Sequence, residues 1–397
     1  MFFATLAMDI LEKERYNTKK CCFYDCILRY KVEYYFIRNR EVIMEYKGKK
    51  IYTEEPQTGD RYRQNYESGL QKYIEKLNQK GAQVRKEFMP PETFPQKIEE
   101  YRREYLTMLG IDGMDISAPE RYECEEIGED EMGKIYRYAL YVTEEIPFYG
   151  ILFVPHERPQ KAPLVIAQHG GSGTPELAAD MLGRNNYNHM IHRVLERGAI
   201  VFAPQLLLWR FKDDKCLTQR QHNIPYDRKI MDASLKRFGL SITGLEIAFI
   251  RKAISFFSHM EGVDSEKIGM LGLSYGGYFT LHTMAADTRI KVGYSNACFN
   301  DRDHYTRFTD WCYKDAGYRF QDAEVAALCA PRKLFLSVGM ADTVFDYRHA
   351  IPEAERVKDY FKAFEKEENL IFTVWEGGHT VNDSDEGYDF LFDALNG

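Results

Sequence analysis

The sequence lacks the features that would assign it to a membrane, nucleic-acid-binding or disulfide-rich class. No apolar run approaches the ~20 residues that a membrane-spanning helix needs. Acidic residues outnumber basic ones by 61 to 53, and the net charge of −8 argues against a nucleic-acid partner. The eight cysteines are scattered along 397 residues, which indicates free thiols rather than a disulfide framework. These absences favour a cytoplasmic globular protein.

Metal motifs, repeats and targeting signals are also missing. The only cysteine cluster, Cys21, Cys22 and Cys26, has no histidine near it, because the first histidine of the chain is His156. Residues 1–9 are apolar but have no basic start, so we expect no signal peptide there. No internal repeat or low-complexity tract occurs. We therefore expect no metal and no cofactor.

A short motif in the second half of the chain carries the strongest chemical signal. Residues 272–276 read G-L-S-Y-G, with a buried strand predicted over 267–272 and a helix over 276–286. A serine on such a strand-to-helix turn exposes its hydroxyl at a helix N-terminus, where backbone N–H groups favour negative charge. The pattern predicts that Ser274 is a nucleophile.

Three other predicted strands end in residues that would complete a catalytic site. The strand over 162–168 precedes His169, Gly170 and Gly171, and the strand over 333–338 precedes Asp342. The strand over 369–375 precedes His379. Open α/β sheets place their sites at such strand ends, and the chain order is serine, aspartate, histidine. The expected oxyanion donors are the N–H of Tyr275 and that of Gly171 or Gly170.

These motifs resemble the α/β-hydrolase family from about residue 135 to the end of the chain. Residues 330–333 and 263–268 resemble the acetyl-xylan-esterase-like and dienelactone-hydrolase-like branches, and residues 274–278 resemble prolyl-oligopeptidase-type peptidases. The resemblance implies a serine esterase with Ser274, Asp342 and His379 as its triad. It also implies a mostly parallel sheet with helices on both faces.

Several histidines and aspartates have alternative roles. Asp346 lies four residues after Asp342 and could replace it as the acid, although Asp342 lies nearer the strand end. His349 is expected to be structural. His169 is expected to organise its loop, because a second base on the oxyanion side has no task.

The chain is predicted to divide near residue 130. Residues 131–397 form the catalytic domain, which begins with a strand hairpin over 135–142 and 148–154. Residues 1–130 form a mostly helical extension, with an amphipathic helix over 95–109 that packs on the catalytic domain. The aromatic run over 30–46 is a candidate contact for a homo-oligomer or a lid over the active site.

Two aromatic and charged segments, 205–214 and 298–313, follow strand ends and are expected to line the substrate pocket. Arg210, Phe299 and Trp311 are the candidate substrate contacts, and packing against the sheet is the alternative. The expected function is a serine carboxylesterase that acts on short-chain, small-molecule esters, with a carbohydrate deacetylase as its most specific form. A prolyl-oligopeptidase-like peptidase is the runner-up, and a non-catalytic binding protein is less favoured.

Overall fold

The computed structural model describes residues 44–208 and 228–397. Its contacts divide the chain into two units between Ile74 and Glu75, a point that lies inside helix α3 (Asp60–Phe88). The first unit contains the short hairpin of β1 (Glu45–Tyr46) and β2 (Lys49–Lys50). Arg210 and most of the aromatic run over 30–46 lie outside the described residues.

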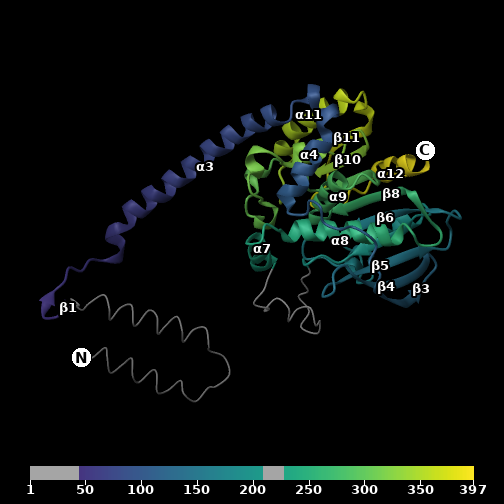
Figure 1. The fold of residues 1–397 in the computed structure, drawn as a ribbon, viewed down its shortest axis with the longest axis horizontal. Coiled ribbons are helices and arrows are strands. Elements are labelled where there is room, and N and C mark those ends of the chain that lie inside the picture. Colours follow the sequence, from purple (N-terminus) through teal and green to yellow (C-terminus); the bar gives the residue numbers. More distant parts are fainter. Residues whose placement is uncertain (1–43, 209–227) are drawn as a thin grey trace, which may run out of the picture. The chain divides into compact units, whose positions relative to one another are not determined.

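The second unit is built on one nine-stranded sheet (Figure 1). From one edge to the other its strands are β11 (Leu370–Trp375), β10 (Lys333–Gly339), β9 (Ile290–Asn296), β8 (Val263–Leu273), β6 (Ala162–Gln168), β7 (Ile200–Pro204), β5 (Pro147–Pro155), β4 (Gly133–Tyr141) and β3 (Tyr122–Glu129). The five pairings that link β7 to β11 through β6 are parallel. The three remaining pairings, β3 with β4, β4 with β5 and β5 with β7, are antiparallel. The predicted hairpin start and the mostly parallel sheet are therefore confirmed.

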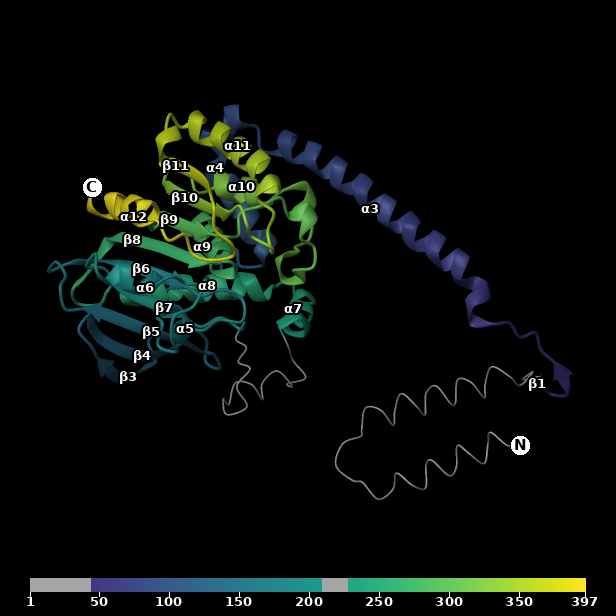
Figure 2. The ribbon, with the colours of Figure 1, turned by 180° about the vertical axis from the view of Figure 1, so that it is seen from behind.

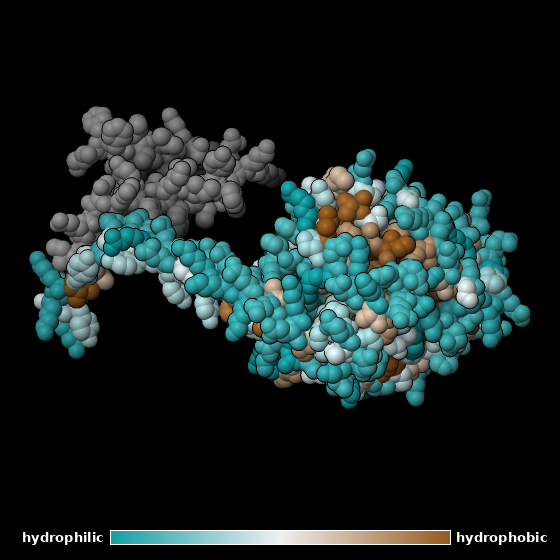
Figure 3. All heavy atoms as spheres, turned by 90° about the horizontal axis from the view of Figure 1, so that it is seen from above, coloured by the Kyte–Doolittle hydropathy of each residue, from teal (hydrophilic) through white to brown (hydrophobic). Residues whose placement is uncertain are grey.

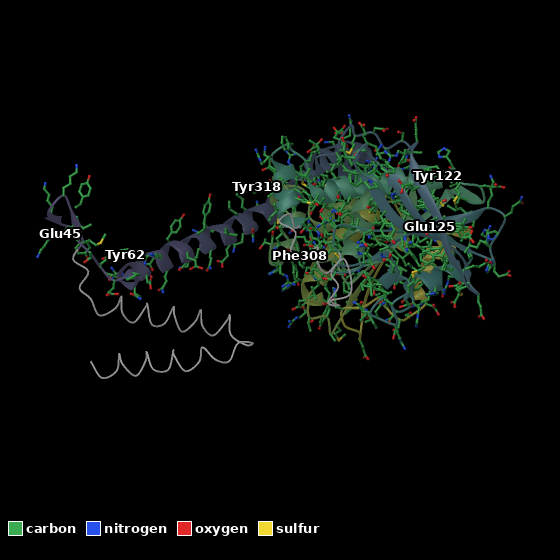
Figure 4. All side chains as sticks on the ribbon, turned by 90° about the horizontal axis from the view of Figure 1, so that it is seen from below. Glu45, Tyr62, Tyr122, Glu125, Phe308 and Tyr318 are labelled. Atoms are coloured by element: carbon green, nitrogen blue, oxygen red, sulfur yellow. The ribbon has the colours of Figure 1, made fainter. Side chains whose placement is uncertain are left out.

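Strand β3 is an element that the sequence pattern does not reveal. It pairs with β4 at the edge of the sheet, and almost all of its residues are exposed. Tyr122 and Glu125 lie on this strand (Figure 4), and the Glu125 side chain is 69% exposed. A strand without a buried face has no apolar alternation, so periodicity cannot detect it.

Helices cover both faces of the sheet, as the strand pattern requires (Figure 2). Along β6, Leu164 and Ile166 enter one core cluster, whereas Val165 and Ala167 enter the other, because successive side chains point to opposite faces. The first cluster is covered by α4 (Phe94–Leu109), α8 (Ile242–Phe257), α9 (Tyr275–Ala286), α10 (Asp322–Ala327) and α11 (Tyr347–Ala363). The second is covered by α5 (Pro175–Ala178), α6 (Met190–Leu195) and α12 (Glu386–Asn396).

Helix α4 belongs to the larger unit. Its Tyr101, Tyr105 and Leu109 side chains are buried in the first core cluster, which confirms the helix predicted over 95–109 and its packing. The buried Arg102 donates to the main-chain oxygens of Ala285 and Leu328, at 2.9 Å each. Since α4 and β3 both join this unit, the structure places the division at residue 74, earlier than the predicted boundary near 130.

In the view of Figure 3 the surface is predominantly hydrophilic, with smaller hydrophobic groups between the hydrophilic side chains. Within the described ranges, no helix has the length and apolar content that crossing a membrane requires.

Candidate active site

Ser274 lies on a sharp turn between β8 and α9. Its backbone has φ 58° and ψ −116°, a conformation that non-glycine residues rarely adopt. The turn is crowded, because a Cβ on Gly276 would lie 2.0 Å from the main-chain oxygen of Gln168. Only glycine fits there, so the glycine of the motif is needed for the close approach of α9 to β6. The local geometry is that of a nucleophile elbow.

The loop after β6 lies against this turn, and its hydrogen bonds distinguish the two alternative oxyanion donors, the N–H groups of Gly170 and Gly171. A Cβ on Gly170 would lie 3.4 Å from the Ser274 Cβ, and one on Gly171 would lie 3.1 Å from the Tyr275 ring. The Gly170 N–H donates to the hydroxyl of Tyr187 at 2.8 Å. The N–H groups of Gly171 and Tyr275 have no hydrogen-bond partner among the described residues. Gly171, and not Gly170, is therefore free to donate to an oxyanion.

His169 organises this loop through both ring nitrogens. Its Nε2 accepts the Leu206 N–H at 3.0 Å, and its Nδ1 lies 2.8 Å from the main-chain oxygen of Gly170. Desolvation by complete burial lowers the pKa of His169 to about 4, so the ring is neutral at pH 7. The expectation that His169 is a loop residue agrees with these contacts.

Asp342 and His379 meet at the ends of β10 and β11. Asp342 Oδ2 accepts a hydrogen bond from His379 Nδ1 at 2.8 Å, and Oδ1 accepts from the N–H groups of Val344 and Phe345 at 2.6 and 3.0 Å. The Asp342 side chain is 1% exposed and that of His379 is 22% exposed. The aspartate is thus held by its own turn and fixes the ring of the histidine. The Ser274 hydroxyl has no hydrogen bond with a described residue, and such bonds often tighten only when substrate binds.

The alternative acid, Asp346, has a different role. Its Oδ1 accepts from the Arg348 N–H at 2.9 Å at the start of α11, and the Arg348 guanidinium pairs with its carboxylate. These contacts lower the pKa of Asp346 well below its ordinary value. His349 stacks on His304 with ring centroids 3.9 Å apart. Of the two aspartates, only Asp342 contacts His379.

The aromatic segment 298–313 mainly packs against the elbow helix. Phe299 is 1% exposed and lies in the core, so its side chain is not placed to contact a substrate. Trp311 is 7% exposed and stacks on Tyr278 at 4.2 Å. Phe308 (Figure 4) is half-buried and packs against the Tyr275 ring at 5.7 Å. The packing alternative therefore describes Phe299 and Trp311 better than substrate contact does.

A buried network of charged side chains, which the sequence analysis missed, contacts Tyr275 at the start of the elbow helix α9. Arg228, at the start of α7 (Arg228–Lys236), lies 2.7 Å from a Glu246 carboxylate oxygen and 2.6 Å from one of Asp310. The Tyr275 hydroxyl donates to Asp310 at 3.1 Å. All three charged side chains are less than 10% exposed. Because these residues are far apart in sequence, no local pattern connects them.

Replacement of Arg228 by Met is expected to lower the free energy of unfolding by about 3–5 kcal/mol, because two buried carboxylates lose their cation. Urea denaturation measures the change. The matched control is Arg348→Met, since the Arg348 side chain is 74% exposed and its solvent-screened pair with Asp346 should contribute little to stability. Equal losses in the two variants would contradict a structural role for the Arg228 network.

The prolyl oligopeptidase family model matches residues 249–389, which include Ser274, Asp342 and His379. No curated protein sequence matches the chain.

Solved structures resemble the chain over most of its length. A Bacteroides fragilis protein assigned as an acetyl xylan esterase is 14% identical, with 72% of this chain and 76% of that chain covered at a TM-score of 0.57. A glucuronoyl esterase from Solibacter usitatus is 14% identical, and the match covers 75% of this chain and 92% of that chain at a TM-score of 0.53. Acetyl xylan esterase 1 from a Thermoanaerobacterium species is 16% identical, and the match covers 76% of this chain and 94% of that chain at a TM-score of 0.50. At these identities the likeness establishes the fold alone: the chain has the α/β-hydrolase fold.

Proposed function

We propose that the protein is a serine carboxylesterase in which Ser274 is the nucleophile, His379 the general base and Asp342 the residue that orients it. The observation that carries this proposal is the 2.8 Å contact between His379 Nδ1 and a buried, fully hydrogen-bonded Asp342. This pair follows β10 and β11, and the strained serine follows β8 of the same sheet. Strand ends of one open sheet converge on one site.

The mechanism follows from these positions. As the Ser274 hydroxyl attacks the acyl carbonyl carbon, His379 Nε2 takes its proton, because Asp342 holds the other ring nitrogen in its N–H form. The N–H groups of Tyr275 and Gly171 donate to the oxyanion, at a typical ~3–4 kcal/mol per donor. The alcohol leaves with the proton from His379. Water then attacks the acyl-enzyme, again with His379 as base, and releases the acid and free Ser274.

Short acyl groups on a carbohydrate or similar polar alcohol are the substrate class that we favour. The Phe345 ring, which is 2% exposed, lies 5.8 Å from the His379 ring and 5.7 Å from the half-buried Phe308 ring, so Phe308 is the accessible aromatic face of this cluster beside the base. Aromatic faces bind sugar rings well and leave little volume for a long acyl chain. The similar structure named as an acetyl xylan esterase supports the same class.

A panel of p-nitrophenyl esters tests the acyl preference. We expect kcat/KM to fall from acetate to octanoate, because each methylene that the site cannot bury loses ~0.8 kcal/mol and adds a clash. Ser274→Ala in the same assay gives the background rate. An increase in kcat/KM out to decanoate would reject the short-chain preference and indicate a lipid esterase.

A serine peptidase of the prolyl oligopeptidase type is the second candidate, favoured by the match over residues 249–389. Such enzymes usually carry a propeller of repeats ~40–50 residues long, and this chain contains no repeat. Turnover of an aminoacyl-p-nitroanilide at a higher kcat/KM than p-nitrophenyl acetate would favour the peptidase.

A further inference from the structure

We propose that Asp180, His189 and His192 form a binding site for one divalent transition-metal ion of the zinc type. Asp180 follows α5, and the two histidines stand at the start of α6. Asp180 Oδ2 lies 2.8 Å from His189 Nδ1 and 3.5 Å from His192 Nδ1. All three candidate ligand atoms lie within 4.8 Å of one another.

The donor set fits the chemistry of zinc. Two imidazole nitrogens and one carboxylate oxygen are a common set of three protein ligands, with a water molecule in the fourth position. Bonds of ~2.0–2.2 Å in a tetrahedron place ligand atoms about 3.3 Å apart, close to the separations here. His192 lies in the first turn of α6, and His189 is its N-cap residue in a left-handed conformation with φ 58°; their ring centroids lie 6.2 Å apart.

Unsatisfied buried atoms give an independent indication of a missing ligand. The Asp180 side chain is only 10% exposed, and its Oδ1 has no hydrogen-bond partner. The Nδ1 of His192 is buried and makes no hydrogen bond, although Asp180 Oδ2 lies 3.5 Å from it. In the described part of the chain, no lysine or arginine pairs with Asp180. Oδ1 belongs to the same carboxylate whose Oδ2 lies beside both histidines, and a cation held by this carboxylate would lower the cost of burying its charge.

The site is open to solvent on its histidine side. The side chains of His189 and His192 are 51% and 32% exposed. His192 also lines a small, partly open surface pocket together with Ala179 and Met181, the neighbours of Asp180. An ion can therefore reach the site without unfolding of the loop.

The loop between the ligands links both halves of the candidate active site. Tyr187 accepts the Gly170 N–H, and the main-chain oxygen of Asn186 accepts the Val381 N–H at 3.0 Å. The Asn188 side chain donates to the Val381 oxygen at 2.6 Å. An ion held by Asp180 on one side of this loop and His189 on the other would fix the contacts that position the oxyanion loop and the segment after His379. The metal is thus a structural ion and takes no part in the chemistry.

Titration of the metal-stripped full-length protein with ZnCl₂ tests the proposal without any activity assay. By calorimetry we expect one equivalent to bind, and His189→Ala or His192→Ala to weaken binding at least about tenfold. At a zinc concentration a hundredfold above the wild-type Kd, the Tm of the wild type should rise by about 5 °C and that of either variant by about half as much or less. The absence of binding by the wild type would overturn the proposal and leave a histidine–aspartate ion pair.

Two controls locate the ion. His259→Ala, which changes an exposed histidine at the end of α8, and His379→Ala should both bind zinc like the wild type. Loss of binding in His379→Ala would overturn the proposal by moving the ion to the Asp342–His379 pair. Co²⁺ should give a spectrum without thiolate-to-metal bands, and the presence of such bands would overturn it in favour of cysteine ligands.

Discussion

Ser274→Ala is expected to lower kcat/KM for p-nitrophenyl acetate by at least about 10⁴-fold, with the far-UV circular dichroism and Tm unchanged. The variant keeps the oxyanion N–H groups and the Asp342–His379 pair but has no atom to form the acyl-enzyme. Only the contribution of the oxyanion hole and substrate binding remains. Ser258→Ala, at the end of α8, is the matched control and should keep wild-type activity. A variant that kept more than about a tenth of the activity would show that Ser274 is not the nucleophile.

A double variant sharpens this test. His379→Ala alone should cost a similar factor, and Ser274→Ala/His379→Ala should cost no more than either single change, because the two residues act as one unit. Additive losses would instead indicate that the two side chains serve separate steps.

Asp342→Asn is expected to lower kcat by about 10⁴-fold with little change in KM, whereas Asp346→Asn should leave both within a few-fold of the wild type. An asparagine at 342 fits the same space but favours the wrong tautomer of His379, so Nε2 carries the proton and cannot act as base. Asp346 instead contacts Arg348 and starts α11, so its replacement affects local stability only.

The comparison of these two variants decides between neighbouring aspartates at the end of the same strand. Steady-state kinetics with p-nitrophenyl acetate gives kcat and KM, and urea unfolding controls for stability. A drop in kcat for Asp346→Asn as large as that for Asp342→Asn would mean that the observed contact with His379 is not the catalytic one.

The mostly parallel sheet and its hairpin start could be predicted because they rest on local patterns. Buried strands read as short apolar runs, and the turn chemistry of residues 272–276 marks the elbow. Helix α4 has its apolar residues at helical spacing and ends at Gly110, which has φ 79°. Strand β3 has neither signal, since it is exposed on nearly every residue. The earlier division at residue 74 follows from the same cause, because β3 joins the sheet, and α4 packs on the helices that cover it, through long-range contacts.

The identities of the strand-end residues Ser274, Asp342 and His379 follow from the sequence alone, because their chain order and positions after apolar runs are local facts. Only the tertiary structure decided which of the alternative site residues near them are already engaged in other contacts. Gly170 is committed to Tyr187, and Asp346 to Arg348, while Phe299 is buried in the core. Each of these outcomes depends on which hydrogen bonds and packing contacts a group makes in three dimensions. Such contacts join residues that no pattern along the chain brings together, as the Arg228 network and the Asp180 cluster also illustrate.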